Sequence, residues 1–390
     1  MDHKIPWIGF VLALSFVPLL LASALAPLHR ANPLERIPNS FVVVLKDNCN
    51  ELDLADVITK TEILSRRYRF EVKITNKYTK VYLGYSLEVS DKFVEVIRSI
   101  EEVEYVEEDS MVYARQSRIP WNLDRLDQRD LPLDNVFNPA GDGSGVNAYV
   151  VDTGIRYTHS EFGGRALPFY DFQSGDGSDC HGHGTHAAGV IGGLTQGVAK
   201  NVQLHSVRIL NCAGTGTIAQ IIGGLDFLAS NGQSPGVASV AISSGPSLAF
   251  DNAVRGVINA GFQTAIAAGG SSADACNVSP ARIEEGITVA GSGSRDTLVS
   301  SSNTGPCVHI VAPGESIRSA WHTGDFEYRV ITGTSSAAAH AAGVCAVILQ
   351  ETPTLTPEKV KNELILDSTN DRLNNVPVDT PNLLTYTSAN

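Results

Sequence analysis

Short apolar segments alternate with helical segments over most of the second half of the chain, and this alternation constrains the fold most. The apolar segments read VNAYVV (146–151), VQLHSVRIL (202–210), ASVAIS (238–243), QTAIAAG (263–269) and GITVAGS (286–292). Helices are expected between them from about Thr185, over 218–229 and over 252–259. Apolar strands separated by helices are typical of a parallel sheet that is buried on both faces. The sequence therefore predicts an α/β fold: a doubly wound, mostly parallel sheet with helices on both faces.

The ends of two predicted elements place polar residues where ligands usually bind. In such sheets ligands bind beyond the carboxyl ends of the strands, and Asp152 ends its strand there. The Ala-rich segment 336–349 is expected to be helical, which puts Ser335 at a helix N-terminus beside free backbone N–H groups. That position favours a developing negative charge.

Three motifs supply the residue types of nucleophilic catalysis. VVDTGI (150–155), HGTHAAG (183–189) and GTSSAAAHAAG (333–343) offer Asp152, His183 and Ser335. A serine hydroxyl is a weak nucleophile unless a base takes its proton, and a histidine base needs a carboxylate to hold its tautomer. The order Asp, His, Ser is the subtilisin order, which differs from the chymotrypsin and α/β-hydrolase orders.

Two other interpretations of these motifs remain open. DTG and GTS triplets are common in turns, and a histidine is often only a core residue. Alternatively, His181, His183 and His186 could hold a metal ion, since His183 and His186 lie three residues apart on one helix face. No carboxylate stands at the spacing of a metal motif, so serine catalysis is the preferred interpretation.

Composition limits the partners. A chain of 390 residues that is 43% hydrophobic can bury a substantial core and has room for two folded units. Its 29 basic and 42 acidic side chains give a formal charge of −13. This charge disfavours nucleic acid and anionic lipid as partners.

Residues 1–26 have the layout of a cleavable signal peptide. Lys4 precedes an apolar run over 5–21, and small residues such as Ala22 and Ala24 follow it. An uncleaved membrane anchor is the alternative, but no later segment is long enough to span a bilayer. We expect a secreted, extracellular protein with no membrane contact after signal removal, in which disulfides are chemically admissible.

A small α+β unit is predicted between residues 41 and 114. Its elements are a strand FVVVLKD (41–47), a helix over 53–68, two strands between about 70 and 89, a helix over 91–100 and a strand VEYVEED (103–109). The polar, aperiodic stretch ARQSRIP (114–120) then predicts an exposed linker that is open to proteolysis. A last helix is expected from Thr356, with Pro357 in its first turn.

The chain resembles the subtilase serine proteases, specifically the proteinase K-like branch that includes aqualysin. Besides the catalytic motifs, the resemblance rests on PWNLDRLDQRDLP (120–132), SVRILNCAGTGT (206–217) and ADACNVSPAR (273–282), and it covers nearly everything after the signal. It implies a ferredoxin-like, inhibitor-type propeptide at 38–113 and a subtilisin-like peptidase domain at 114–390. Such a propeptide assists folding, is cut autocatalytically, here near Tyr113 and Ala114, and leaves its C-terminus in the active site.

The resemblance also implies residue roles. Ser335 is the nucleophile, His183 is the general base and then the acid, and Asp152 is the carboxylate that orients His183. An unperturbed histidine titrates near about 6.5, so activity is expected to rise with pH through that region. Residues implied to bind substrate are Gly214, Thr215, Gly216, Ser243, Ser244, Gly245, Ala268 and Gly269.

Two departures from the family bear on rate and specificity. The family reads Ala-Ala-Gly-Asn where this chain has AAGG at 267–270, so Gly270 replaces the side-chain donor of the oxyanion hole, whereas Thr334 keeps its family identity. In subtilisin, removing that donor costs about 10²–10³ in turnover. The segment around Ser243 and Ser244 also differs from the family's Met-Ser-Leu-Gly-Gly-Gly and is expected to be shorter, which leaves the cleavage preference open.

Six cysteines do not reveal their pairing by number alone. The resemblance implies bridges Cys180–Cys212 and Cys276–Cys307, with Cys345 a buried unpaired thiol and Cys49 left over in the propeptide. No cofactor is implied for the chemistry. Family members commonly bind calcium for stability, largely through loop carbonyls, so the resemblance leaves a structural calcium ion open. At the position of one relative's calcium-binding aspartate this chain has Gly293, and no metal ligand is assigned.

The sequence thus predicts a secreted, monomeric serine endopeptidase that is made as a self-processed zymogen. Its partners would be protein or peptide substrates and its own propeptide as an intramolecular inhibitor, and its turnover would be reduced by Gly270. The alternative is a catalytically impaired binding or regulatory protein built on the protease fold.

Overall fold

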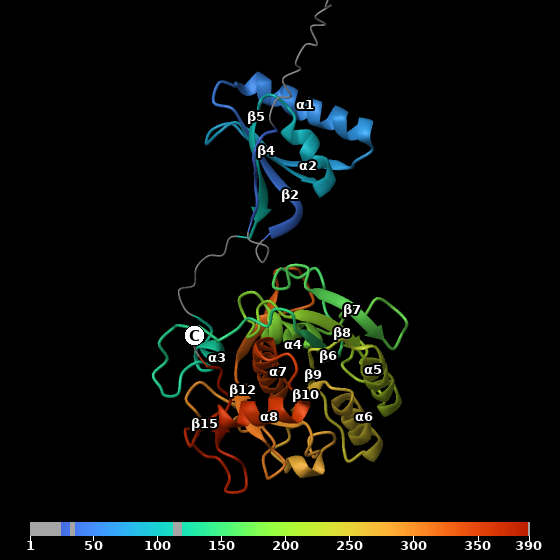
Figure 1. The fold of residues 1–390 in the computed structure, drawn as a ribbon, viewed down its shortest axis with the longest axis vertical. Helices are drawn as coiled ribbons and strands as arrows, with labels where there is room; N and C mark the ends of the chain where they lie inside the picture. Colours follow the sequence, from blue (N-terminus) through green and yellow to red (C-terminus); the bar gives the residue numbers. More distant parts are fainter. Residues whose placement is uncertain (1–24, 32–35, 112–118, 389–390) are drawn as a thin grey trace, which may run out of the picture. The chain divides into compact units, whose positions relative to one another are not determined.

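The computed structural model describes residues 25–31, 36–111 and 119–388 (Figure 1). The processing site predicted at Tyr113 and Ala114 lies outside the described residues, as does nearly all of the signal peptide predicted at 1–26. The chain divides into two compact units, Met1–Met111 and Val112–Asn390, and each is described by itself.

The first unit has the βαββαβ order of ferredoxin-like folds, with one short strand added in front. Its elements are β1 (Leu28–His29), β2 (Arg36–Leu45), α1 (Glu51–Tyr68), β3 (Val72–Tyr78), β4 (Gly84–Val89), α2 (Asp91–Arg98) and β5 (Val103–Ser110). The sheet order is β1-β5-β2-β4-β3, and only the β1–β5 pair is parallel. The predicted α+β unit is confirmed, although strand β1 was not predicted.

A nine-stranded sheet forms the centre of the second unit, in the order β15-β16-β12-β11-β10-β9-β6-β8-β7. The strands are β6 (Asn147–Asp152), β7 (Ala166–Asp171), β8 (Gln203–Arg208), β9 (Gly236–Val240), β10 (Gln263–Ala267), β11 (Ile287–Ser292), β12 (Ile310–Pro313), β15 (Thr369–Asn370) and β16 (Leu383–Leu384). Neighbouring strands are parallel except for the β15–β16 pair. The predicted mostly parallel sheet is confirmed.

Helices cover both faces of this sheet (Figure 1). They are α4 (His183–Gly192), α5 (Ile218–Asn231), α6 (Leu248–Asn259), α7 (Thr334–Glu351) and α8 (Pro357–Leu366), in addition to the single turn α3 (Trp121–Asp124) and a short 3-10 helix, Ala275–Asn277. Alternate residues of a strand point to opposite faces. Accordingly, Ala148 and Val150 of β6 pack in the core with α4, α7 and α8, whereas Tyr149 and Val151 pack with α5 and α6.

Helix starts are where the sequence prediction and the structure differ. Helix α7 begins at Thr334 rather than at residue 336, because Gly333 is its N-cap, so Ser335 lies inside the first turn. Helix α6 begins four residues earlier than predicted, since the Ser247 hydroxyl accepts the N–H of Phe250 and caps it. Helix α4 begins at His183 itself.

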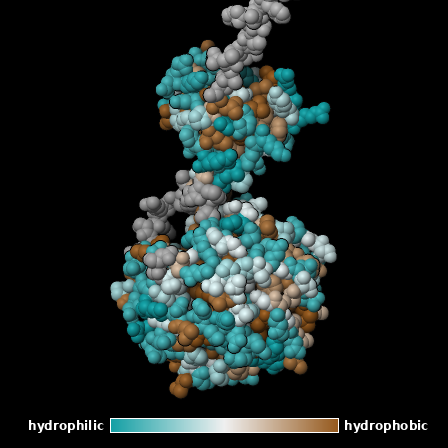
Figure 2. All heavy atoms as spheres, viewed as in Figure 1, coloured by the Kyte–Doolittle hydropathy of each residue, from teal (hydrophilic) through white to brown (hydrophobic). Residues whose placement is uncertain are grey.

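Several strands of the second unit have no counterpart among the predicted apolar segments; besides β12, β15 and β16, they include an edge strand and a hairpin. The edge strand β7 is largely exposed or half-buried, and the hairpin β13 (Ile317–Ala320) and β14 (Tyr328–Ile331) lies outside the main sheet. On the face drawn in Figure 2, hydrophobic residues form small, separate patches among hydrophilic ones. Within residues 25–31, 36–111 and 119–388, no helix has both the length and the apolar character needed to cross a membrane.

Candidate active site

The end of strand β6 and the start of helix α4 bring Asp152 and His183 together. His183 Nδ1 lies 2.8 Å from Oδ2 and 2.9 Å from Oδ1 of Asp152. The Asp152 side chain is fully buried, whereas 26% of the His183 side chain is exposed. The backbone N–H of Thr153 also donates to Asp152 Oδ1, at 2.7 Å. The carboxylate thus engages one ring nitrogen and leaves Nε2 for proton transfer.

The charge of Asp152 raises the pKa of His183 above its ordinary value of 6.5. Burial opposes this rise, while the hydrogen bond to Asp152 and the charge of Asp179 add to it. A base of raised pKa accepts a proton more readily, at the cost of being protonated over more of the acidic range.

Ser335 is the second residue of helix α7, and its backbone N–H is one of the first four, which have no partner inside a helix. Helices α4 and α7 pack against each other. The structure joins His183 to Asp152 but records no hydrogen bond between His183 and the Ser335 hydroxyl in the described part of the chain. Such bonds often tighten only when substrate binds.

The segment that follows strand β10 lies beside helix α7, because Thr334 Oγ1 accepts the N–H of Gly269 at 3.2 Å. Gly269 has φ +102°, and a Cβ there would lie 2.4 Å from Asn303 Nδ2, so only glycine fits. Gly270 is exposed, and a Cβ there would meet nothing within 4 Å. A side chain at this position would therefore enter open space.

The buried side chain of Asn303 holds this loop. Its Oδ1 accepts the N–H groups of Ser271 and Ala273 at 2.9 and 3.0 Å, and its Nδ2 donates to the Ala268 carbonyl at 2.9 Å. The Ser272 hydroxyl donates to the Ser300 carbonyl at 2.8 Å, so its proton is already engaged within the loop.

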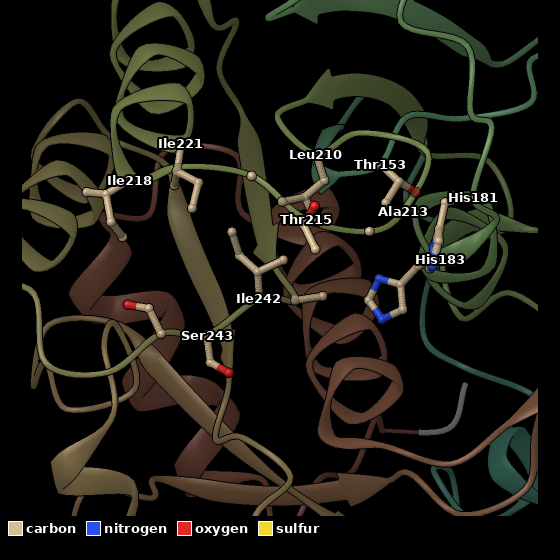
Figure 3. Close-up of a pocket in the computed structure, with 14 residues that line it drawn as sticks. Thr153, His181, His183, Leu210, Ala213, Thr215, Ile218, Ile221, Ile242 and Ser243 are labelled. Atoms are coloured by element: carbon tan, nitrogen blue, oxygen red, sulfur yellow. The ribbon is translucent and has the colours of Figure 1, made fainter.

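A cavity of about 540 Å³ extends from His183 (Figure 3). Figure 3 shows His183 and Thr153 at one end and Ile218 at the other. Of the residues predicted to bind substrate, Gly214, Thr215, Gly216, Ser243 and Ser244 line it, whereas Gly245, Ala268 and Gly269 do not. Ser335, Thr334 and Gly270 are not among its lining residues either.

The apolar part of this cavity was not predicted from the sequence. Its aliphatic walls are Leu210, Ile218, Ile221 and Ile242. Ile218 and Ile221 are three residues apart at the start of α5, so helical spacing could have placed them on one face. Leu210 and Ile242 come from separate loops, and only the fold brings them there.

The three histidines proposed as an alternative metal site have other contacts. His183 Nδ1 is engaged by Asp152, and His186 Nε2 lies 3.0 Å from the Ile317 carbonyl oxygen. The His181 and His183 rings are 6.4 Å apart, and His181 instead packs against Gly214. Among the described residues, no group of three or more His, Cys, Asp or Glu side chains is placed to hold a metal ion.

Two disulfides cross-link the second unit. Cys180–Cys212 and Cys276–Cys307 have Cα–Cα distances of 4.9 and 5.2 Å. The first ties the loop before His183 to the loop that carries Gly214. Cys49 and Cys345 are unpaired, and burial raises the pKa of the Cys345 thiol to about 12. A Cβ added at Gly293 would lie 2.3 Å from Oε2 of Glu315.

Comparison with known proteins decides the family. Residues 143–380 match the family described as the Subtilase family, and residues 40–115 match the family described as Peptidase inhibitor I9. The chain belongs to the subtilase family. It is a serine-type endopeptidase with an inhibitor-type propeptide, and subtilases need no cofactor for catalysis.

Two relatives of this subtilase are bacterial proteases. It is 41% identical to the extracellular serine proteinase of Thermus sp. (strain Rt41A), over 93% of this chain and 92% of that protein. It is 43% identical to the alkaline serine exoprotease A of Vibrio alginolyticus, over 75% of this chain but only 56% of that protein. The crystal structure of a cold adapted subtilisin-like serine proteinase matches with a TM-score of 0.68 and 47% identity, covering 70% of this chain and all of that one.

Proposed function

We propose that this subtilase is made as a secreted zymogen and cuts peptide bonds through an acyl-enzyme on Ser335. One observation carries the proposal: the buried carboxylate of Asp152 lies 2.8 Å from His183 Nδ1, at the N-terminus of α4. Helix α4 packs against α7, whose first turn holds Ser335. These positions support the proposed roles of the three residues.

The proposed reaction has two halves. His183 Nε2 takes the hydroxyl proton as Ser335 Oγ bonds to the substrate carbonyl carbon, and the same proton then goes to the leaving amine as the C–N bond breaks. A water molecule, deprotonated by His183, next attacks the ester carbon, and Ser335 regains its proton as the acid product leaves. Asp152 stabilises the imidazolium in both halves without becoming protonated.

The oxyanion hole is the altered part of this proposal. The backbone N–H of Ser335 remains available at the start of α7, but Gly270 has no side chain with which to donate. We therefore assign the protein a reduced turnover. The same observation favours a second candidate, a catalytically impaired binding or regulatory protein that keeps its propeptide in place.

Maturation is proposed to remove two segments. The signal at 1–26 would be cleaved on secretion, and the propeptide at 38–113 would be cut near Tyr113 and Ala114 by the protease itself. Before release, the propeptide would inhibit the active site from its own C-terminus. A structural calcium ion is implied by the resemblance alone, and no ligand residue is assigned to it.

The test is expression of the full chain and of its Ser335→Ala variant. The parent should yield a mature protein that begins close to Ala114 and hydrolyses members of a peptide panel. Ser335→Ala should stay uncut and lose hydrolysis by at least about 10³-fold. Equal hydrolysis by the two proteins would contradict the assignment of Ser335.

A further inference from the structure

The carboxylate of Asp179, four residues before His183, accepts five hydrogen bonds. Oδ1 accepts from Thr153 Oγ1 at 2.9 Å and from the backbone N–H groups of His181 and Gly182 at 2.8 and 2.9 Å. Oδ2 accepts from the N–H and the hydroxyl of Thr185 at 2.9 and 2.6 Å. We call Asp179, Thr153 and Thr185 the Asp179 network.

This network holds His183 on both sides. Gly182 and Gly184 are the chain neighbours of His183. The Gly182 N–H donates to Asp179 Oδ1, and the Gly184 N–H donates to Thr153 Oγ1 at 2.9 Å. Thr153 directly follows Asp152 in the chain, so its hydroxyl links the residue that orients the His183 ring to the backbone that carries that ring.

The N-terminus of α4 needs such a partner. Its N-cap, Gly182, has φ +108° and no side chain with which to cap the first N–H groups of the helix. Asp179 takes that role from outside the helix by accepting the N–H of Thr185. A carboxylate at a helix N-terminus is also favoured by the helix dipole.

The charge of Asp179 is not cancelled locally, because no Lys, Arg or His side chain forms an ion pair with it in the described part of the chain. Of the groups that face His183, Asp152 lies on β6, His181 on the preceding loop with its ring 6.4 Å away, and His186 one turn further along α4. Asp152 and Asp179 are the two anions among them, and both raise the pKa of His183.

We propose that Asp179 is a positioning residue of this protease, which fixes the backbone of His183 and places a second carboxylate close to its imidazole. The inference rests on the proposed function, in which His183 is the base. It adds a second carboxylate, with a different task from that of Asp152: Asp152 touches the ring, whereas Asp179 holds the backbone on either side of it.

Asp179→Asn tests both parts in the full chain, processed as usual. The acid limb of kcat/KM should move about half a pH unit lower, because one anion is removed near His183. The plateau should fall by about tenfold, because the Thr185 N–H loses its acceptor and the loop relaxes. The matched control is Asp176→Asn, which removes an exposed carboxylate three residues away in the same loop. Its acid limb should overlay that of the parent.

A second measurement does not depend on turnover. In the full chain carrying Ser335→Ala, the ring resonances of His183 can be titrated by NMR with and without Asp179→Asn. An unchanged midpoint, or a shift no larger than that of Asp176→Asn, overturns the electrostatic part. Failure of the proposed function would show instead as hydrolysis that survives Ser335→Ala.

A second variant covers the case in which Asp179→Asn does not fold. Thr153→Val removes the hydroxyl that joins Asp179 to Gly184 and keeps the shape of the side chain, whereas Thr153→Ser keeps the hydroxyl. We expect kcat to fall about tenfold in Thr153→Val with KM nearly unchanged, and Thr153→Ser to restore it. Equal kcat in these two variants overturns the positioning role.

Discussion

Gly269 lies directly against the buried side chain of Asn303: a Cβ added at Gly269 would stand 2.4 Å from Asn303 Nδ2. Asn303 in turn fixes the two N–H groups of Ser271 and Ala273. The loop that carries Gly270 is therefore fixed by its contacts with Asn303, whereas Gly270 itself faces open space. This contrast predicts how the two adjacent glycines respond to substitution.

Gly270→Asn is expected to raise kcat by about 10²-fold, because the side chain enters open space and restores a donor for the oxyanion. The measurement is steady-state hydrolysis of a peptide ester and a peptide amide by the mature protein. Gly269→Asn is the matched control and should lower activity, since its φ of +102° and the Asn303 contact both exclude a side chain. No gain in Gly270→Asn would favour the impaired binding protein.

The catalytic pH dependence follows from the sign of the His183 shift. The base works when neutral, and Asp152 raises the pKa of His183 above 6.5, so activity should be complete at alkaline pH and lost as pH falls through a midpoint above 6.5. The measurement is kcat/KM from pH 5 to 10. A midpoint at or below 6.5 would contradict it.

Asp152→Asn should reduce kcat by about 10⁴-fold, the loss seen for the corresponding change in a chymotrypsin-type protease. The neutral amide cannot hold the imidazole in the tautomer that leaves Nε2 free to accept a proton. Burst kinetics with an active-site titrant separates slow chemistry from misfolding. Retention of more than about a tenth of the parent kcat would argue against Asp152 as the orienting group.

The sequence predicted the sheet well because its signal is local. Apart from the edge strand β7, each strand from β6 to β11 overlaps one of the apolar segments of the sequence, and burial on both faces of a sheet favours such segments. The first residues of the helices were predicted less accurately. A helix start is set by a single capping residue, such as Ser247 or Gly333, rather than by a long pattern. The disulfides came from the family resemblance, since the spacing of six cysteines does not select one pairing.

The site was predicted only where a motif marks it. Asp152 and His183 stand in motifs, and the structure bonds them. Ile218 and Ile242 come from distant segments and share a cavity only after folding. Asp179 has a local signal that the analysis missed: an aspartate just before a helix start is a common capping residue.

A buried ion pair predicts a stability effect away from the site. Arg125 Nε and Nη2 donate to Asp296 Oδ1 and Oδ2 at 2.8 and 3.1 Å, and the Arg125 side chain is only 1% exposed. Asp296→Asn should destabilise the second unit by about 3–5 kcal/mol, because the buried guanidinium loses its counter-charge. Asp130→Asn, which breaks an exposed pair with Arg372, should cost less than about 1 kcal/mol. Unfolding of both variants is best compared in the Ser335→Ala background, which prevents autolysis.

Three buried histidines predict how stability changes with acid. Burial lowers the pKa of His186 to about 3 and those of His205 and His340 to about 4. The pKa of a histidine in the unfolded chain is about 6.5. As pH falls below that value, the unfolded state therefore binds protons that these three side chains do not bind in the folded state. Stability should therefore decline from about pH 6.5 down to about pH 4. His183, whose pKa is raised, makes the folded state relatively more stable in acid, but its single contribution is outweighed by those of the three buried histidines.

His205→Gln isolates one of these contributions. His205 Nε2 lies 2.8 Å from Asn147 Oδ1 and the ring stacks on Tyr149, so an amide keeps the polar contact without a group that titrates. Each proton difference contributes about 1.4 kcal/mol per pH unit, and the slope of unfolding free energy between pH 4.5 and 6 should fall by about that amount. Tryptophan fluorescence reports this unfolding, since Trp121 and Trp321 both belong to the second unit. An unchanged slope would mean that His205 is protonated in the folded protein, and that its burial against Tyr149 does not exclude the charged form.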